Sequence, residues 1–329
     1  MLAIRIDAHG GPEMLRPVDM VQPTPAPDEV LVRNEWIGVN FVDTQHRVGT
    51  PYPVTLPLIP GIEAAGIVVE PGAGVTDLGP GDRVAYAGPM VGVYAELAAV
   101  PRSVLVDVPA GLDNRDAAAV LLQGMTTQLM THDVHLGRPG ETALVHAAAG
   151  GTGSLLVQFL LAQGVTVIAT ASPGPKTAYL RSLGVDHVLD SRRPDLADAV
   201  LGVVPGGVDV VFDSVGRATF ETSLRAVRPM GLIVEFGQSS GPVPPVDIAR
   251  LSGLTGEGLP GSLTLTWPTL SDHNATREAL VRHAAAVFQA VLDGTLRPAI
   301  AGTFPLREAG RAHELLESRS VVGKVLLEA

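Results

Sequence analysis

A glycine-rich stretch in the middle of the chain has the residue types of a phosphate-binding turn. Residues 148–153 read Ala-Ala-Gly-Gly-Thr-Gly, so the pattern G-x-G-x-x-G loses its first glycine but keeps Gly150 and Gly153. A dinucleotide pyrophosphate must approach the backbone at a helix N-terminus, and a bulky side chain at Gly150 or Gly151 would prevent this. An unliganded turn is the alternative, and the motif by itself does not decide between the two.

The elements around this stretch favour dinucleotide binding. The apolar run 143–145 precedes it, and an apolar helix that ends before Gly164 follows it. Four further apolar runs alternate with helical stretches, and this βαβ series predicts a parallel sheet with helices on both faces. The runs are 165–169, 187–189, 208–212 and 232–236, and the helical stretches are 176–183, 195–203 and 218–228.

The residues after the second and third of these strands indicate which dinucleotide binds. NAD enzymes place a carboxylate at the end of the second strand, against the ribose 2′-hydroxyl, whereas residues 169–172 read Ala-Thr-Ala-Ser. Lys176 follows closely, and Arg192 and Arg193 follow the third strand, so this end of the site suits a 2′-phosphate. We therefore predict NADPH as the cofactor; the alternative is that these cations are ordinary surface residues.

Composition limits the class of protein. The chain of 329 residues has room for about two domains, and its net charge of −11 argues against binding to nucleic acid or anionic membranes. It contains no cysteine, which excludes disulfides, thiolate nucleophiles and cysteine-bound metals and fits a reducing compartment. We find no apolar run long enough to span a membrane and expect a soluble cytoplasmic protein.

The first 120 residues differ in character from the middle of the chain. Short strand-like runs at 30–36, 66–69, 83–85 and 94–100 are separated by Pro and Gly, which predicts a small β-rich domain. A helix over 115–130, with Asp113 or Asn114 as N-cap, leads into the nucleotide domain. A sixth strand at 263–267 and an amphipathic helix at 275–292 follow. The predicted domains are 1–120 with 269–329, and 121–268.

Several motifs together resemble a known family. Gly61-Ile62-Glu63-Ala-Ala-Gly66-Ile-Val68, followed by Gly81-Asp82-Arg83-Val84, is similar to the core signature of the medium-chain dehydrogenase/reductase superfamily. Further motifs extend the match over nearly the whole chain: they begin at Gly38, His146, Asp213, Phe236 and Ala312. The chain resembles the zinc-free NADPH:quinone oxidoreductase (zeta-crystallin-like) branch, which implies a GroES-like β-rich catalytic domain plus a Rossmann domain.

The resemblance also bears on metal content. Zinc alcohol dehydrogenases of the superfamily have His where this chain has Ile62, and they bind zinc through cysteines that are absent here. The remaining candidate is His132-x-x-His135, which we interpret as a pair at a helix end facing solvent. We therefore expect no bound metal and no metal-assisted alcohol oxidation.

The resemblance implies the site residues. Asn40 and Thr126 are expected beside the nicotinamide, because Asn40 offers a donor and an acceptor to a carboxamide and Thr126 offers a hydroxyl. The expected catalytic pocket consists of Asn40, Gln45, Tyr52, Thr126 and Trp267. The expected cofactor contacts are Asn40, Thr126, Gly150, Gly151, Thr152, Gly153, Ser172, Lys176, Ser191, Arg192, Phe236, Gly237, Ser239, Ser240 and Arg319.

Some positions depart from the family pattern or allow another interpretation. Ser191 and Gln45 stand where relatives carry Tyr. Trp267 stands where relatives often have Arg, and it either makes the mouth of the pocket less positive or covers the core. Asp43 either contributes to the site or braces a turn. Gly237-Gln-Ser239-Ser-Gly241 fits the hydrolase pattern G-x-S-x-G, but Pro242 and Pro244-Pro245 forbid the helix that a nucleophile elbow needs.

Three functions are therefore weighed. The leading one is metal-free reduction of quinones by hydride transfer from NADPH in the interdomain cleft. The alternative in the same class is reduction of activated C=C bonds in enones or enoyl thioesters. The alternative in a different class is an NADPH-binding structural or RNA-binding protein, although the acidic composition argues against RNA. Because residues 262–267 form a predicted edge strand, a homodimer is expected.

Overall fold

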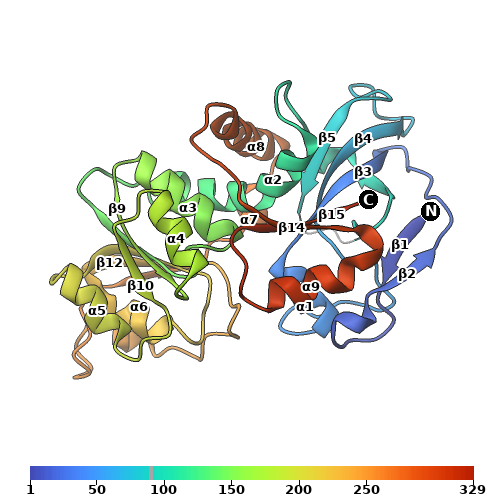
Figure 1. The fold of residues 1–329 in the computed structure, drawn as a ribbon. Helices are drawn as coiled ribbons and strands as arrows, with labels where there is room; N and C mark the ends of the chain where they lie inside the picture. Colours follow the sequence, from blue (N-terminus) through green and yellow to red (C-terminus); the bar gives the residue numbers. More distant parts are fainter. Residues whose placement is uncertain (89–91) are drawn as a thin grey trace. The chain divides into compact units, whose positions relative to one another are not determined.

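The computed structural model describes residues 1–88 and 92–329, which form two compact units (Figure 1). The first unit combines Met1–Thr126 with Leu270–Ala329, so it is built from both ends of the chain. The second unit is the continuous segment Thr127–Thr269.

The second unit is organised around a six-stranded sheet in which every strand pair is parallel. The strands are β8 (Thr142–Val145), β9 (Thr166–Ala171), β10 (His187–Asp190), β11 (Val208–Asp213), β12 (Val227–Glu235) and β13 (Thr264–Thr266). Their order, β10-β9-β8-β11-β12-β13, is the doubly wound order of a Rossmann fold. The predicted α/β fold is confirmed for this unit, and β13 is its edge strand as expected.

Both faces of this sheet are buried, which explains the continuous apolar runs of its strands. On one face, Val145, Phe212 and Val234 pack with residues of α3 (Gly151–Ala162) and α4 (Pro175–Ser182). On the other face, residues of the same strands pack with α5 (Leu196–Val203) and α6 (Phe220–Ala226) (Figure 1). The side chains therefore alternate between two separate cores.

The main boundary error in this unit concerns β12. The sequence predicts a helix to residue 228 and a strand from residue 232, but α6 ends at Ala226 and β12 begins at Val227. The register with β11 shifts between Val208 and Val210, and Met230 has a φ of 60°. This irregular start hides the first residues of the strand from a search for unbroken apolar runs.

The first unit is mostly β-structure. Its seven-stranded sheet has the order β14-β15-β3-β4-β5-β7, with β6 also paired to β3, and a separate hairpin-like pair is formed by β1 (Leu2–Arg5) and β2 (Arg16–Asp19). The sheet strands are β3 (Glu29–Val39), β4 (Glu63–Pro71), β5 (Arg83–Ala87), β6 (Leu97–Pro101), β7 (Leu105–Asp107), β14 (Ile300–Pro305) and β15 (Lys324–Glu328). The red C-terminal strands thus lie in the same sheet as the blue β3 (Figure 1).

Helices complete the first unit. They are α1 (Phe41–Val48), most of α2 (Asn114–Gln128), α7 (Leu270–His273), α8 (Arg277–Leu292) and α9 (Ala309–Glu317). Asp113 is the N-cap of α2, because its Oδ1 accepts the backbone N–H of Asp116 at 2.7 Å. The prediction that this helix continues to residue 130 is wrong: the chain changes after Gln128 into a π-helix over Leu129–Val134.

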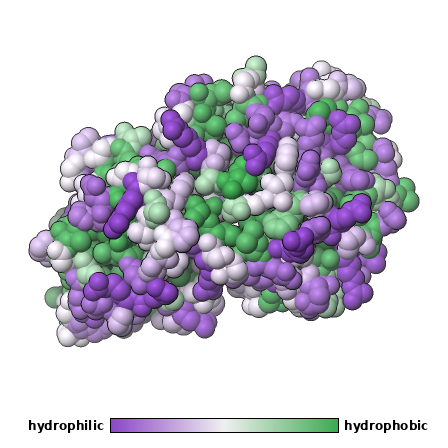
Figure 2. Space-filling model, in the orientation of Figure 1, coloured by the Kyte–Doolittle hydropathy of each residue, from purple (hydrophilic) through white to green (hydrophobic). Residues whose placement is uncertain are grey.

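The surface drawn in Figure 2 is mixed in polarity. On the face drawn in Figure 2, hydrophilic and hydrophobic residues are interspersed. Among the helices of the described residues, none combines the length and the apolar character that a membrane span requires.

Candidate functional site

The glycine-rich turn joins β8 to α3 at the carboxyl edge of the Rossmann sheet. Gly150 is the N-cap of α3, and the first intrahelical bond runs from Ser154 N to Gly150 O at 2.9 Å. A Cβ on Gly153 would lie 2.5 Å from Ala147 O and 2.8 Å from Ala148 Cα, so only glycine fits this close contact of helix and strand. The amides of Gly151, Thr152 and Gly153 precede the first intrahelical bond and can face an anion.

The residues expected at the 2′-phosphate are brought together by two neighbouring strands. Ala171 and Asp190 pair across β9 and β10, and Ser191 N donates to Ala171 O at 3.0 Å. Ser172 and Ser191 therefore follow the ends of adjacent strands, and Lys176 lies in the first turn of α4. That these residues hold a 2′-phosphate stays a prediction.

Asp190 adds a carboxylate that the sequence analysis did not consider. Arg192 donates to it twice, from Nε to Oδ1 and from Nη2 to Oδ2, each at 3.1 Å. These bonds hold the pKa of Asp190 below its ordinary value. The guanidinium of Arg192 is therefore paired with this carboxylate, whereas the sequence predicts that it faces a 2′-phosphate together with Lys176.

The segment after β12 is fixed against the turn after β11. Ser240 Oγ donates to Val215 O at 2.7 Å, and Ser239 N donates to Ser214 O at 3.2 Å. A Cβ on Gly237 would lie 2.8 Å from Ser214 O, so this position also requires glycine. Residues 241–247 form no helix, which confirms that Ser239 is not on a nucleophile elbow.

A row of polar residues lies just behind these turns. The strand registers place Thr170, His146, Asp213 and Glu235 side by side at the ends of β9, β8, β11 and β12. Asp213 accepts from Thr219 Oγ1 and Ser223 Oγ of the α6 region, both at 2.7 Å. Burial lowers the pKa of His146, which is fully buried.

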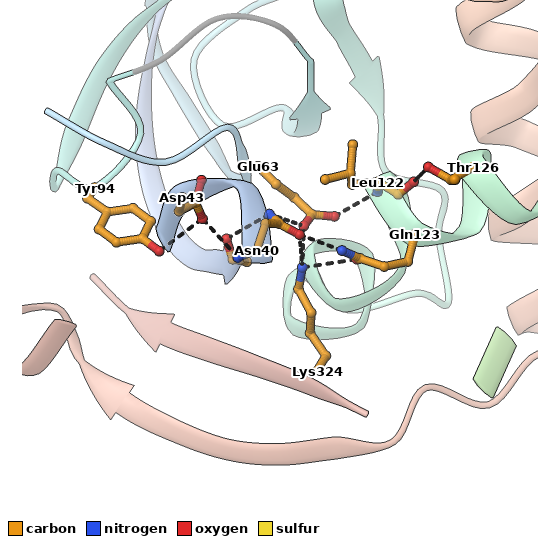
Figure 3. A network of polar contacts seen from close by, with 9 residues as sticks. Asn40, Asp43, Glu63, Tyr94, Leu122, Gln123, Thr126 and Lys324 are labelled. Atoms are coloured by element: carbon orange, nitrogen blue, oxygen red, sulfur yellow. Dashed lines mark hydrogen bonds and ion pairs between the residues drawn. The ribbon is translucent and has the colours of Figure 1, made fainter. Parts of the chain in front are cut away.

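In the first unit, Asn40 is the centre of a buried hydrogen-bond network (Figure 3). Its Nδ2 donates to Gly38 O and to Glu63 Oε2, each at 3.1 Å. Its Oδ1 accepts from Lys324 Nζ at 2.7 Å and also from Gln123 Nε2. The sequence predicts that the Asn40 amide binds a carboxamide. In the structure, the NH₂ group and the oxygen of this amide already form hydrogen bonds within the protein.

Asp43 and Tyr94 extend this network (Figure 3). Asp43 Oδ2 accepts the backbone N–H of Asn40 at 2.8 Å, so Asp43 braces the first turn of α1. The Tyr94 hydroxyl lies 3.0 Å from Asp43 Oδ2 and 3.0 Å from His313 Nε2. Burial raises the pKa of Asp43 to about 7 and lowers that of His313 to about 3. All three side chains are buried.

The other expected pocket residues are placed as follows. Thr126 Oγ1 donates to Leu122 O at 2.8 Å, so its hydroxyl retains accepting capacity. Gln45 lies on α1, and Tyr52 follows that helix with 39% of its surface exposed. Trp267, 42% exposed, directly follows β13 of the second unit. Arg319 follows α9 in a left-handed conformation, with a φ of 54°.

The histidine pair at the end of the π-helix is engaged with the protein. His132 Nδ1 lies 2.9 Å from Thr131 Oγ1, and its ring packs edge-on against Phe159. His135 Nε2 lies 3.1 Å from Glu141 Oε2. Within residues 1–88 and 92–329, no three His, Cys, Asp or Glu side chains are grouped so that they could hold a metal ion.

Comparison with known proteins gives matches over the whole chain. Residues 26–110 match the family described as the alcohol dehydrogenase GroES-like domain, and residues 183–327 match the family described as zinc-binding dehydrogenase. A quinone oxidoreductase of Pseudomonas aeruginosa is 42% identical over 98% of both chains. The structure of Escherichia coli quinone oxidoreductase complexed with NADPH is 36% identical, with a TM-score of 0.95 over all of both chains.

This chain belongs to the quinone oxidoreductase family of the medium-chain dehydrogenases and reductases. The GroES-like match confirms the expected class of the first unit. The chain is also similar to a 2-haloacrylate reductase of a Burkholderia species, with 38% identity over 99% of this chain and 98% of that protein.

The residues that sequence reasoning missed in this member of the family are Glu63, Gln123 and Lys324. Glu63 stands next to Ile62, inside a motif that carried the resemblance, and Gln123 stands three residues before Thr126. Lys324 lies in the last strand, after the end of the motif that begins at Ala312. The position of Lys324 at the start of an apolar run could have indicated a buried ion pair, because a lysine in a buried strand rarely lacks a partner.

Proposed function

We propose that this protein is an NADPH-dependent reductase that transfers hydride to quinones. The observation that carries the proposal is the match, over the full length of both chains, to a quinone oxidoreductase solved with NADPH. The polar and basic cluster after β9 and β10 supports the choice of NADPH, because Ser172 and Lys176 stand where an NAD enzyme needs a carboxylate.

The second unit fits the dinucleotide. Gly150, Gly151, Thr152 and Gly153 would face the pyrophosphate with backbone amides, and Ser172, Lys176, Ser191 and Arg192 would hold the 2′-phosphate. Phe236, Gly237, Ser239 and Ser240 would border the groove beside the turn after β11. Arg319, Asn40 and Thr126 complete the proposed set from the first unit.

When bound, the nicotinamide supplies the hydride. We propose that Asn40, Gln45, Tyr52, Thr126 and Trp267 orient the acceptor. None of these side chains is charged, and none is a strong acid. A quinone needs the least help from such a pocket, since the hydroquinone anion formed by hydride addition is already stabilised. The protein then acts by holding donor and acceptor in position and excluding water.

The test is a comparison of acceptors at saturating NADPH. We expect kcat/KM to be higher for simple quinones than for aldehydes, ketones or enoyl thioesters, by about tenfold or more because the latter require a proton donor. Parallel assays without acceptor give the background rate of NADPH oxidation. Equal or better turnover of an enoyl thioester would contradict the proposal.

Reduction of activated C=C bonds is the second candidate. It is favoured by the full-length similarity to 2-haloacrylate reductase, whose name states that activity for that protein. Measuring kcat/KM for 2-chloroacrylate and for a simple enone, beside the quinones, decides between quinone reduction and C=C reduction. A preference for these substrates over quinones by an order of magnitude would promote this candidate.

We further propose that two copies associate through β13. This strand ends the sheet and pairs with β12 on one side. Near it in the chain, Ile248 and Leu254 expose 79% and 88% of their surface. An edge strand with exposed apolar neighbours is typical of a surface that pairs with another strand.

A further inference from the structure

Four buried side chains from distant parts of the sequence form a closed cluster, which we call the polar clamp: Asn40, Glu63, Gln123 and Lys324 (Figure 3). Each comes from a different element: the cap of α1, β4, α2 and β15. Lys324 and Glu63 are the charged pair, with 2.6 Å between Nζ and Oε2. Only 3% of Lys324 and none of Glu63 is exposed, so water does not complete their bonding.

The hydrogen bonds of the polar clamp are complete at its cation. An ammonium has three N–H donors, and Lys324 Nζ donates to Asn40 Oδ1 at 2.7 Å, Glu63 Oε2 at 2.6 Å and Gln123 Oε1 at 3.0 Å. The other carboxylate oxygen, Glu63 Oε1, accepts the backbone N–H of Leu122 at 2.7 Å. One carboxylate therefore connects the cation to the backbone of α2.

This arrangement determines which way the Asn40 amide faces. Its oxygen lies against the Lys324 ammonium, and its NH₂ group lies against the Glu63 carboxylate. Rotating the amide by half a turn would bring N–H groups against a cation and an oxygen against an anion, in a buried site where such contacts are costly. The ion pair thus selects one orientation of Asn40.

The polar clamp also links the two helices of the first unit that carry expected pocket residues. Asn40 begins α1, on which Gln45 lies. Leu122 and Gln123 lie one turn before Thr126 on α2, and Thr126 Oγ1 is bonded to Leu122 O. We propose that Lys324 and Glu63 are positioning residues, which hold Asn40 and the Thr126 turn in the geometry needed for hydride transfer. This inference rests on the proposed function.

A purely stabilising role is the competing explanation. Buried ion pairs are weak evidence for stability, because desolvating two charges offsets most of their attraction, and neutral replacements are often tolerated. The two roles predict different results once the charge is removed from both partners. A stabilising pair can be replaced by a neutral one without loss of rate, whereas a positioning pair cannot.

The kinetic test uses Lys324→Met, Glu63→Gln and the double variant, assayed with NADPH and a quinone. We expect each single variant to lose thermal stability and to lower kcat about tenfold or more, with the KM for NADPH changed less than twofold. The double variant should recover thermal stability, since no unpaired charge remains, but not kcat. Recovery of kcat together with stability would overturn the proposal.

Arg47→Met is the matched control. Arg47 is 1% exposed and pairs with Glu317 at 2.6 Å in the same unit, and within residues 1–88 and 92–329 no hydrogen bond or ion pair joins it to the polar clamp. It should therefore lower thermal stability while kcat at 25 °C stays within twofold of the wild type. A loss of kcat equal to that of Lys324→Met would show that any buried ion pair here has this effect, and would contradict a specific role.

Hydrogen exchange provides a readout that needs no activity. Without the Lys324 ammonium, we expect faster deuterium uptake in peptides that cover residues 118–126, because the Leu122 amide depends on a fixed Glu63. Arg47→Met should leave these peptides unchanged. If the wild type reduces no acceptor, the proposed function is wrong, but hydrogen exchange still tests whether the polar clamp fixes α2. Unchanged deuterium uptake in Lys324→Met would contradict the proposed role of the polar clamp.

Discussion

Glu235 is a buried acid whose two carboxyl oxygens have no hydrogen-bond partner among the described residues. It lies at the end of β12, beside Asp213 in the neighbouring strand, and 2% of its surface is exposed. Burial, and to a smaller extent the Asp213 carboxylate, raise its pKa from 4.5 to about 9. At neutral pH the folded protein therefore holds this side chain as an uncharged acid.

This shift predicts a pH-dependent stability. Between pH 4.5 and about 9 the unfolded chain releases the Glu235 proton and the folded protein keeps it. The contribution of Glu235 to stability is therefore fully present below pH 4.5 and is lost as the pH rises towards 9. Glu235→Gln removes this dependence. We expect its melting temperature, relative to the wild type, to rise by about 3 °C or more between pH 5 and pH 8.

The difference between Glu235→Gln and the wild type reports on Glu235 alone, because the Asp43 carboxyl, whose pKa is also raised, is present in both proteins. Glu70→Gln, at an exposed position, is the control and should show the same difference from the wild type at both pH values. An equal difference for Glu235→Gln at pH 5 and pH 8 would show that Glu235 is ionised in the folded protein.

The choice between NADPH and NADH is also made at single residues. Lys176→Ala should raise the KM for NADPH about tenfold or more and leave that for NADH nearly unchanged, because only NADPH carries the 2′-phosphate. Arg181→Ala, on the exposed side of the same helix, should change neither KM. A wild type that prefers NADH would refute the assignment.

Asp190→Asn tests the part of this site that the sequence did not reveal. The substitution weakens the two bonds that hold Arg192 and removes a negative charge near the expected phosphate. We expect the KM for NADPH to fall by about two- to fivefold, in the direction opposite to Lys176→Ala. Unchanged KM values would show that Arg192 and Asp190 lie outside the cofactor site.

At the scale of elements, the turn before α3 depends on Gly153. A methyl group there would meet Ala147 O at 2.5 Å and must displace backbone, so Gly153→Ala should destabilise the protein by about 1–3 kcal/mol and weaken NADPH binding. Gly202→Ala is the matched control: it lies in α5 with open space around it and should be neutral or stabilising by up to about 1 kcal/mol. Melting temperatures of both variants, with and without NADPH, provide the measurement.

Regular elements were predictable because their signals are local. The alternation of apolar runs and helices over 143–236 predicts the parallel sheet, and the fold class is confirmed by its strand order. The π-helix after Gln128 carries no such signal, and the early start of β12 coincides with a shift in its register with β11. The polar clamp was equally hidden: Asn40 and Lys324 are 284 residues apart, and nothing in either neighbourhood specifies the other.

At the scale of the whole molecule, the proposed dimer has a direct test. Thr264 lies exposed on the edge strand β13, and a lysine there should oppose pairing with a second strand. We expect light scattering to give a dimeric mass for the wild type and a monomeric mass for Thr264→Lys at micromolar concentration. Val21→Lys adds the same charge at a residue that is 90% exposed in the first unit and should stay dimeric; a monomeric wild type would exclude the dimer.

The position of β15 has a consequence for synthesis on the ribosome. This strand lies between β14 and β3 and carries Lys324, yet it is translated after every other strand of the sheet. The second unit is continuous and can fold while translation proceeds, but the first unit must wait, with Glu63 lacking its counter-ion, until residues 324–328 emerge. A nascent chain stalled before residue 324 should therefore protect its middle segment from protease while its N-terminal 126 residues remain susceptible.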